Sequence, residues 1–198
     1  MPNTQPETYY TIEEYYGLLK SSERRFEYWD GEIVCMSGGS KEHAIIQQNL
    51  AVDFGNRLKS PCRGFGPDMA VKAEINKAGF VFPDLSVACN PEYERNRLGF
   101  DMLLNPIVIC EVVSEHSGVR DYQAKLRAYQ AIASMRDYLV IEPEAGEPYV
   151  THFSRRDTQQ QWDAHVYDNP HDVLEIESVN VKFVLSEIYR DVELNPEE

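Results

Sequence analysis

Two acidic residues lie inside apolar runs of the chain, where a charge is costly. Asp84 follows Pro83 in FVFPDLSVAC, and Glu111 lies within PIVICEVV. Both runs are typical of strands that are buried on both faces. Two carboxylates that converged inside a sheet would repel each other and raise at least one pKa, unless a cation lay between them. Mg²⁺ or Mn²⁺ is the natural partner because hard cations take oxygen ligands.

The spacing of these runs allows the two acids to meet. If the strands pair antiparallel, the midpoint between the acids falls at Arg97 and Leu98, inside the segment NPEYERNRLGFDMLLN. We expect this segment to be a loop, so the register can bring the carboxylates together. The alternative is that the acids act separately, Asp84 as an ordinary residue at the start of a strand and Glu111 as the partner of a nearby arginine.

A lysine on the following helix is the third candidate. Residues 119–133 carry apolar residues at helical spacing, and Lys125 borders that stripe, four residues before Tyr129, which we assign to the core. The Lys125 ammonium could reach back toward the C-terminal end of the strand that holds Glu111. The alternative is a surface pair with Asp121, worth only about 0.3–0.5 kcal/mol. Asp121 is a weaker candidate, expected to orient Lys125 or pair with it.

Two more polar residues lie upstream of the acids. His43 falls on one stripe of a helix predicted over residues 41–58, where it could be a polar cap, a secondary metal ligand or a proton shuttle. Glu32 follows the Asp30-Gly31 turn of a hairpin predicted over residues 26–36, and could equally be an exposed hairpin residue. The remaining histidines lack the spacing of metal ligands, and we expect them in loops or outer strands: His116, His152, His165 and His171.

The order of the predicted elements indicates an α+β, or mixed α/β, protein. A capping box from Thr11 to Glu14 begins a short helix that ends near Lys20. The later elements follow from periodicity and turn signals. They are strands over 69–75, 80–89, 106–113 and 136–143, an outer hairpin formed by 149–157 and 160–168, and a closing helix over 185–192.

The composition of the chain fits one globular domain over residues 1–198, with a core over about 26–143 and the outer hairpin and closing helix in 144–198. No apolar run approaches the roughly 18 residues that cross a bilayer, and the N-terminus lacks the features of a signal peptide. We therefore expect a cytoplasmic protein with no membrane partner. The net charge of −14 argues against a broad basic surface for nucleic acid, but it leaves room for a local basic cleft or an acidic site that recruits divalent cations.

The four cysteines are widely separated and show no CxxC spacing. They are Cys35, Cys62, Cys89 and Cys110. Free cysteine behaves as a small hydrophobic residue, so we interpret them as packing residues. We expect neither a zinc cluster nor a disulfide framework from this spacing.

An ordered set of motifs resembles the Uma-two family of endonucleases, which is common in cyanobacteria. The set consists of Pro83-Asp84, EVVS at 111–114, Asp-x-x-x-Lys-x-x-x-Tyr at 121–129, and RDYLVIEP at 136–143. The hairpin over 26–36 and the pair Glu42-His43 are similar to the N-terminal region of that family. The likeness spans roughly residues 26–143.

The resemblance implies a restriction-endonuclease-like core, because this family belongs to the superfamily whose motif is written PD-(D/E)xK. Such a core has a central mixed sheet flanked by helices, with the two acids on adjacent strands. Asp84 and Glu111 match the acids and would bind Mg²⁺ or Mn²⁺. Val113 occupies the usual lysine position two residues after the second acid, and Lys125 on the following helix matches the relocated lysine.

Two further points follow from the resemblance. His43 and, less securely, Glu32 match polar positions near the family's site. SEHS at 114–117 departs from the more usual SPST, which puts the loop shape and the substrate specificity in doubt.

The function that the resemblance implies is a metal-dependent endonuclease that hydrolyses phosphodiester bonds in nucleic acid, with DNA as the expected substrate. In this reading Asp84 and Glu111 hold the ion, and Lys125 orients the attacking water and helps to neutralise the transition state. The alternative is a non-catalytic binding module of the same fold, which the acidic balance and the missing in-strand lysine favour. A structural homodimer is a third reading, based on apolar strands and aromatic content.

Overall fold

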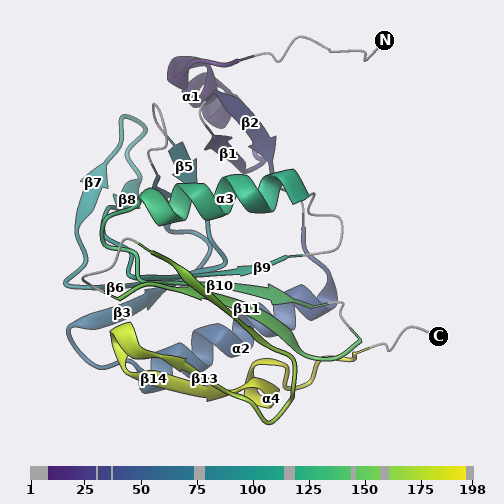
Figure 1. Cartoon of the computed structure of the whole chain (residues 1–198). Coiled ribbons are helices and arrows are strands. Elements are labelled where there is room, and N and C mark those ends of the chain that lie inside the picture. Colours follow the sequence, from purple (N-terminus) through teal and green to yellow (C-terminus); the bar gives the residue numbers. More distant parts are fainter. Residues whose placement is uncertain are drawn as a thin grey trace.

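The computed structural model describes residues 9–29, 31–36, 38–73, 79–113, 119–143, 146–156 and 161–194, and for residues 119–124 it describes the backbone alone. Figure 1 shows the elements along the chain. They are α1 (Ile12–Ser21), β1 (Phe26–Trp29), β2 (Glu32–Cys35), α2 (Lys41–Arg57), β3 (Cys62–Phe65), β4 (Ala70–Lys72), β5 (Gly79–Val81), β6 (Leu85–Cys89), β7 (Tyr93–Arg95), β8 (Asp101–Leu103), β9 (Val108–Val112), α3 (Val119–Ala131), β10 (Asp137–Glu142), β11 (Tyr149–Ser154), β12 (Asp163–Tyr167), β13 (Val173–Ile176), η1 (Glu177–Val179), β14 (Val181–Val184) and α4 (Leu185–Ile188).

A six-stranded mixed sheet lies at the centre of the molecule, in the order β12-β11-β10-β9-β6-β3. β9 and β10 are parallel and are joined through α3, whereas the other neighbouring strands are antiparallel. A parallel pair needs such a crossover, because the chain must return to the end of the sheet where the first strand began, and a tight turn cannot span that distance. α3 lies on one face of this sheet and α2 on the other (Figure 1). The predicted α+β architecture, with a mixed sheet flanked by helices, is confirmed.

β9 is buried on both faces, as its apolar run predicts. Val112 packs in the cluster that contains Phe54 of α2, whereas Ile109 packs in the cluster that contains Tyr129 of α3. Side chains alternate along a strand. Glu111 therefore lies on the same face as Ile109, under α3.

A second six-stranded sheet, in the order β2-β1-β5-β4-β8-β7, packs on the α3 side of the central sheet. Its inner face buries Trp29 and Val71 in the cluster shared with α3 and the central sheet. Its outer face buries Tyr28 and Phe80 against Tyr15 of α1. The early hairpin is thus part of a layer that covers the face on which Glu111 lies.

Local sequence signals account for the ends of these early elements. Thr11 caps α1 in a capping box with Glu14, as predicted. The Ser40 side chain caps α2 by accepting a hydrogen bond from the backbone N–H of His43. In the hairpin of β1 and β2, Gly31 has a φ of 103°, a conformation that glycine adopts without strain.

The predicted strand over residues 80–89 is wrong in one respect, because it is two strands in different sheets. β5 ends at Val81 in the second sheet, and β6 begins at Leu85 in the central sheet. Pro83 lies between them and has no N–H to give to a strand ladder. Asp84 consequently lies where the chain crosses from one sheet to the other.

Three further segments differ from the predictions. The segment 90–105, predicted as a loop, contains the hairpin of β7 and β8. β3 and the hairpin of β13 and β14 were not predicted. The C-terminal hairpin and α4 complete the core beside α2. The rings of Phe183 and Phe54 pack edge to face, with centroids 4.8 Å apart, and Ile188 is buried in the same cluster. The last part of the chain is therefore more than an outer hairpin.

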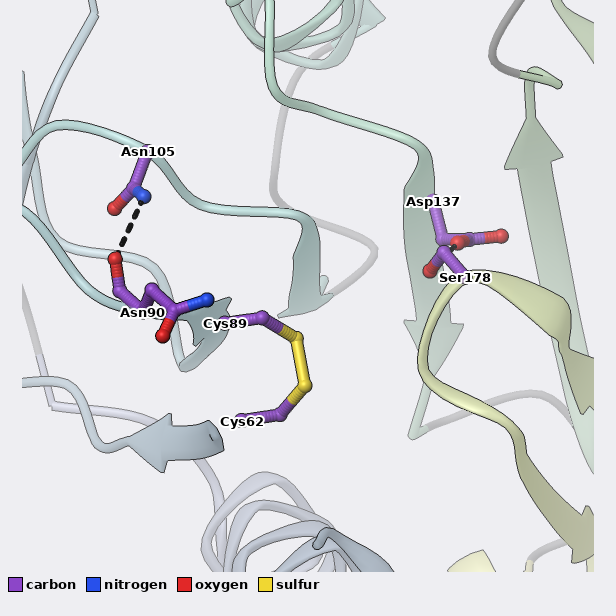
Figure 2. The surroundings of a disulfide bond; sticks show 6 residues. All are labelled: Cys62, Cys89, Asn90, Asn105, Asp137 and Ser178. Atoms are coloured by element: carbon purple, nitrogen blue, oxygen red, sulfur yellow. Dashed lines mark hydrogen bonds between the residues drawn. A yellow bond between two sulfur atoms is a disulfide. The ribbon is translucent and has the colours of Figure 1, made fainter. Parts of the chain in front are cut away.

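A disulfide joins Cys62 to Cys89, which face each other across β3 and β6 (Figure 2). The interpretation of all four cysteines as free packing residues is wrong for this pair and holds for Cys110, which is free and buried. Cys35 is free but exposed, so its assignment as a packing residue is also wrong. The cause is β3, since the pairing depends on the register of a strand that the sequence pattern does not reveal. Disulfides are rare in reducing compartments such as the cytoplasm, so this bond does not support the expected cytoplasmic location. That location stays a prediction. None of the described helices has the length and apolar character needed to span a membrane.

Candidate active site

The antiparallel register of β6 and β9 brings the two predicted acids together. Leu85 lies opposite Cys110, and continuing this register by one residue sets Asp84 opposite Glu111. The backbone N–H of Val112 donates to Oδ2 of Asp84 at 2.7 Å, which ties the start of β6 to the end of β9. The antiparallel pairing anticipated from the spacing of the two runs is present.

α2 supplies two side chains to Asp84. The Nε2 atom of His43 lies 3.2 Å from Oδ2 of Asp84, and the amide of Gln47 donates to Oδ1 at 2.9 Å. The two residues are four positions apart and so share one face of the helix. The hydrogen bond to Asp84 raises the pKa of His43, against the opposing effect of partial burial. His43 thus lies beside the first acid, and Gln47 is a second polar neighbour, to which the sequence pattern assigned no role.

α3 supplies two side chains to Glu111, which is 4% exposed. The Tyr129 hydroxyl donates to Oε1 of Glu111 at 2.5 Å, and Nζ of Lys125 lies 3.3 Å from each carboxylate oxygen. Burial raises the pKa of Glu111 to about 7, although the nearby Lys125 ammonium opposes the rise. The carboxylates of Asp84 and Glu27 raise that pKa further, since a second negative charge disfavours ionisation.

Glu27 of β1 is a neighbour of this group that the sequence did not reveal. Its buried carboxylate accepts hydrogen bonds from the indole N–H of Trp29 and the backbone N–H of Phe82, both at 3.0 Å. Nζ of Lys125 lies 3.7 Å from Oε2 of Glu27, so the lysine lies between two acids from different sheets. A four-residue strand gives too short an alternation to show which face of a hairpin is buried, so Glu27 could not be told from an exposed residue.

The two weaker candidates, Glu32 and Asp121, are not seen to join the group of acids. Glu32 stands opposite Trp29 in β2 and has an exposed side chain, unlike the buried Glu27 and Glu111. The backbone of Asp121 lies in α3, but its side chain is outside the described residues.

The other described histidines make their contacts away from Asp84 and Glu111. His152 and His165 face each other in β11 and β12, as predicted for outer strands. His152 is bound at 2.7 Å by Asp137, which also accepts a hydrogen bond from Ser178 (Figure 2 shows the last pair). His171 lies in a turn, and His116 is outside the described residues.

The donors in this group suit a hard divalent cation. Asp84 and Glu111 present carboxylates from adjacent strands, and the repulsion between them is part of what raises the pKa of Glu111. A cation beside both would remove that repulsion. Within the described ranges no three His, Cys, Asp or Glu side chains are grouped as a metal site, so water or substrate oxygens would complete the coordination shell. Lys125 already places one positive charge beside Glu111.

Comparison with known proteins identifies relatives over most of the chain. The profile of the Uma2 (Uma-two) family, described as "Putative restriction endonuclease", matches residues 12–186. The uncharacterized protein slr1290 of Synechocystis sp. is 30% identical over 190 residues, covering 96% of this chain and 93% of that protein. The uncharacterized protein sll1609 of the same organism is 27% identical over 137 residues, 67% of this chain and 74% of that protein.

A solved structure has the same fold. It is a crystal structure from Anabaena variabilis whose title describes a "putative nuclease". It aligns with a TM-score of 0.67 and 18% sequence identity, over 90% of this chain and 97% of that one. At this identity the likeness establishes the fold alone.

Proposed function

Because this chain belongs to the Uma2 family, we propose that it is a divalent-metal-dependent endonuclease that hydrolyses phosphodiester bonds in nucleic acid, with DNA as the expected substrate. The observation that carries the proposal is the convergence of Asp84 and Glu111 from adjacent strands, with the ammonium of Lys125 beside Glu111. Buried acids with a perturbed pKa and a specific charged neighbour are characteristic of functional sites.

Asp84 and Glu111 are the residues that would hold Mg²⁺ or Mn²⁺. A bound divalent ion supplies charge stabilisation to the phosphate and lowers the pKa of a coordinated water. Hydrogen bonds within the chain hold both carboxylates in fixed orientations. Gln47 and the backbone N–H of Val112 orient Asp84, and Tyr129 orients Glu111.

Lys125 and His43 are the two basic groups beside the acids. The Lys125 side chain is only 13% exposed, so its charge acts in a medium that screens little. It would neutralise negative charge that develops on the phosphate and orient the attacking water. His43, held at 3.2 Å from Asp84, would move a proton to or from solvent, because imidazole can both accept and donate one. The hydrogen bond to Asp84 raises the pKa of His43 and so favours its protonated form.

Cleavage of a supercoiled plasmid tests this proposal. Wild type with Mg²⁺ or Mn²⁺ is expected to nick the plasmid, and excess chelator is expected to stop it. Asp84→Asn and Glu111→Gln each keep the side-chain shape and remove the charge, and we expect at least about a 100-fold loss of cleavage. Glu175→Gln, at an exposed acid paired with Lys182, is the matched control and should cut like wild type. Unimpaired cutting by both site variants would refute the proposal.

One observation favours a non-catalytic binding module instead. Lys125 contacts both Glu111 and Glu27 and so partly neutralises the acids without a metal ion. Titration calorimetry separates the two functions. A nuclease should bind Mn²⁺ through Asp84 and Glu111, whereas a binding module that uses Lys125 as its permanent cation should bind no metal at millimolar concentration and cut neither single- nor double-stranded DNA.

A further inference from the structure

A groove of about 430 Å³ lies on the outer side of the second sheet, beside α1, and we call it the basic groove. Three phenylalanines line it: Phe26 at the start of β1, Phe82 after β5 and Phe100 before β8. All three are half-buried, and the ring centroids of Phe82 and Phe100 are 6.5 Å apart. The volume is within the range of small-ligand sites. The groove therefore presents aromatic surface to solvent at a size that suits one ring system.

The aromatic wall is held in place by its own turn. The side-chain oxygen of Asn96 accepts hydrogen bonds from the backbone N–H groups of Leu98 and Phe100, at 2.9 and 3.2 Å. Gly99 has a φ of 89° at the same turn. Because this turn is bonded internally, Phe100 is presented without loss of conformational freedom on binding.

Cations outnumber anions in the groove, although the whole chain carries a net charge of −14. The lining has three cations, Lys20, Arg24 and Arg25, and a single carboxylate, Asp68. Asp68 pairs with Arg25, whose guanidinium also donates to the Pro67 carbonyl at 3.3 Å. Lys20 and Arg24 are exposed and form no ion pair with any described residue. The groove is therefore locally positive.

We propose that the basic groove binds an unpaired nucleotide of a single-stranded segment of nucleic acid, with the base against the phenylalanines and the phosphates beside Lys20 and Arg24. Aromatic rings stack only on bases whose faces are free, and cations beside them follow the backbone. A duplex hides those faces. This inference rests on the proposed nuclease function, for which it names the class of substrate.

The groove is joined to the candidate active site through the chain itself. Phe82 precedes Asp84 by two residues, so their Cα atoms are at most about 7 Å apart. The backbone N–H of Phe82 donates to Glu27, and Phe26 directly precedes Glu27 in β1. Phe26 and Phe82 lie on the face of the sheet opposite Glu27. The groove and the acids therefore lie on opposite faces of the second sheet, and the short crossing at Pro83 links Phe82 to Asp84.

Fluorescence anisotropy with a labelled 15-nucleotide single strand and a matched duplex, in chelator so that nothing is cut, tests the proposal. Wild type is expected to bind the single strand more tightly. Phe100→Leu keeps the apolar contact but removes the ring, and should weaken single-strand binding about 5- to 100-fold. Lys20→Gln combined with Arg24→Gln should reduce the slope of log Kd against log salt by about 1.4. Lys59→Gln, an exposed lysine outside the groove, should change neither quantity.

The outcomes separate the groove from the chemistry. A wild type that prefers the duplex, or groove variants that bind the single strand as well as wild type, would overturn the groove proposal, and plasmid cleavage would be untouched by that result. If wild type cuts no substrate with Mg²⁺ or Mn²⁺ while the groove variants lose single-strand binding as predicted, the nuclease proposal fails and the groove stands as a binding site.

Discussion

The Nζ atom of Lys125 lies 3.3 Å from both carboxylate oxygens of Glu111, although 14 positions separate the two residues. The helix that follows β9 thus brings a lysine to Glu111, whereas Val113, just after β9, occupies the position of the lysine in the PD-(D/E)xK motif. The same Nζ lies 3.7 Å from Glu27. One cation is shared by two buried acids, and this arrangement decides how the site responds to mutation and pH.

Replacing Lys125 by Met should harm both cleavage and stability. We expect at least about a 100-fold loss of plasmid cleavage, because positive charge beside the phosphate is removed. The free energy of unfolding should fall by about 3 kcal/mol at pH 8, where two buried carboxylates lose their cation, and by less at pH 5, where Glu111 is protonated. Urea unfolding at both pH values measures this. Lys182→Met, which breaks an exposed pair with Glu175, should cost at most about 1 kcal/mol at either pH. An equal loss of unfolding free energy at pH 5 and pH 8 would contradict the assignment of Lys125 as the cation that pairs with ionised Glu111.

The raised pKa of Glu111 should make metal-free wild type less stable as pH rises. Folding raises this pKa from 4.5 to about 7, so the native state binds the proton more tightly than the unfolded chain does. Stability is therefore lost as pH rises from about 4.5 through 7. Glu111→Gln lacks this term and should gain up to about 3 kcal/mol relative to wild type between pH 4.5 and pH 8. Chelator-treated samples should be compared by urea unfolding. A difference that does not change with pH would show that Glu111 titrates normally.

Tyr129 is expected to be a positioning residue for Glu111. Its hydroxyl donates to Oε1 at 2.5 Å and so stabilises the ionised carboxylate. Tyr129→Phe should raise the pKa of Glu111 and move the acid side of the pH profile of cleavage up by about one unit, with activity recovered at higher pH. A purely structural role would lower the rate at every pH and leave the profile in place. Tyr15→Phe, at a buried tyrosine bonded to the Phe26 carbonyl, controls for loss of a buried hydroxyl.

The disulfide should affect stability and leave the chemistry intact. Cys62 and Cys89 are 27 positions apart, and removing the link should cost about 2–4 kcal/mol because it frees a loop of the unfolded chain. Cys89 lies at the end of β6 remote from Asp84, so Cys62→Ser with Cys89→Ser should still cut plasmid at 25 °C. Thermal unfolding with and without reductant measures the effect, and Cys35→Ser, at an exposed free cysteine, is the control. Loss of cleavage in the double serine variant without loss of folded protein would contradict this separation.

The parts of the fold that could be predicted are those with strong local signals. The capping box of α1, the hairpin around Gly31 and the periodicities of α2 and α3 are encoded within a few residues. Spacing was also enough to suggest that Asp84 and Glu111 could face each other, since an antiparallel register depends only on the midpoint of the two strands. Of these elements, α2 carries His43 and Gln47, and α3 carries Lys125 and Tyr129.

The parts that were missed depend on contacts between distant segments. The disulfide partner of Cys89 lies in β3, and β3 is a four-residue strand with Gly64 at its centre and no apolar alternation. Glu27 has a role only because the second sheet packs over α3. Tyr129 looked like a core residue and is one, but its hydroxyl faces Glu111. Tertiary packing supplies this information, and local pattern does not contain it.

Diffraction from crystals soaked in Mn²⁺ tests the central claim most directly. The account predicts an anomalous peak between the carboxylates of Asp84 and Glu111 in wild type, which disappears in crystals of Glu111→Gln. A wild-type crystal with no peak near either carboxylate at millimolar Mn²⁺, or a peak that persists unchanged in the variant, would contradict it.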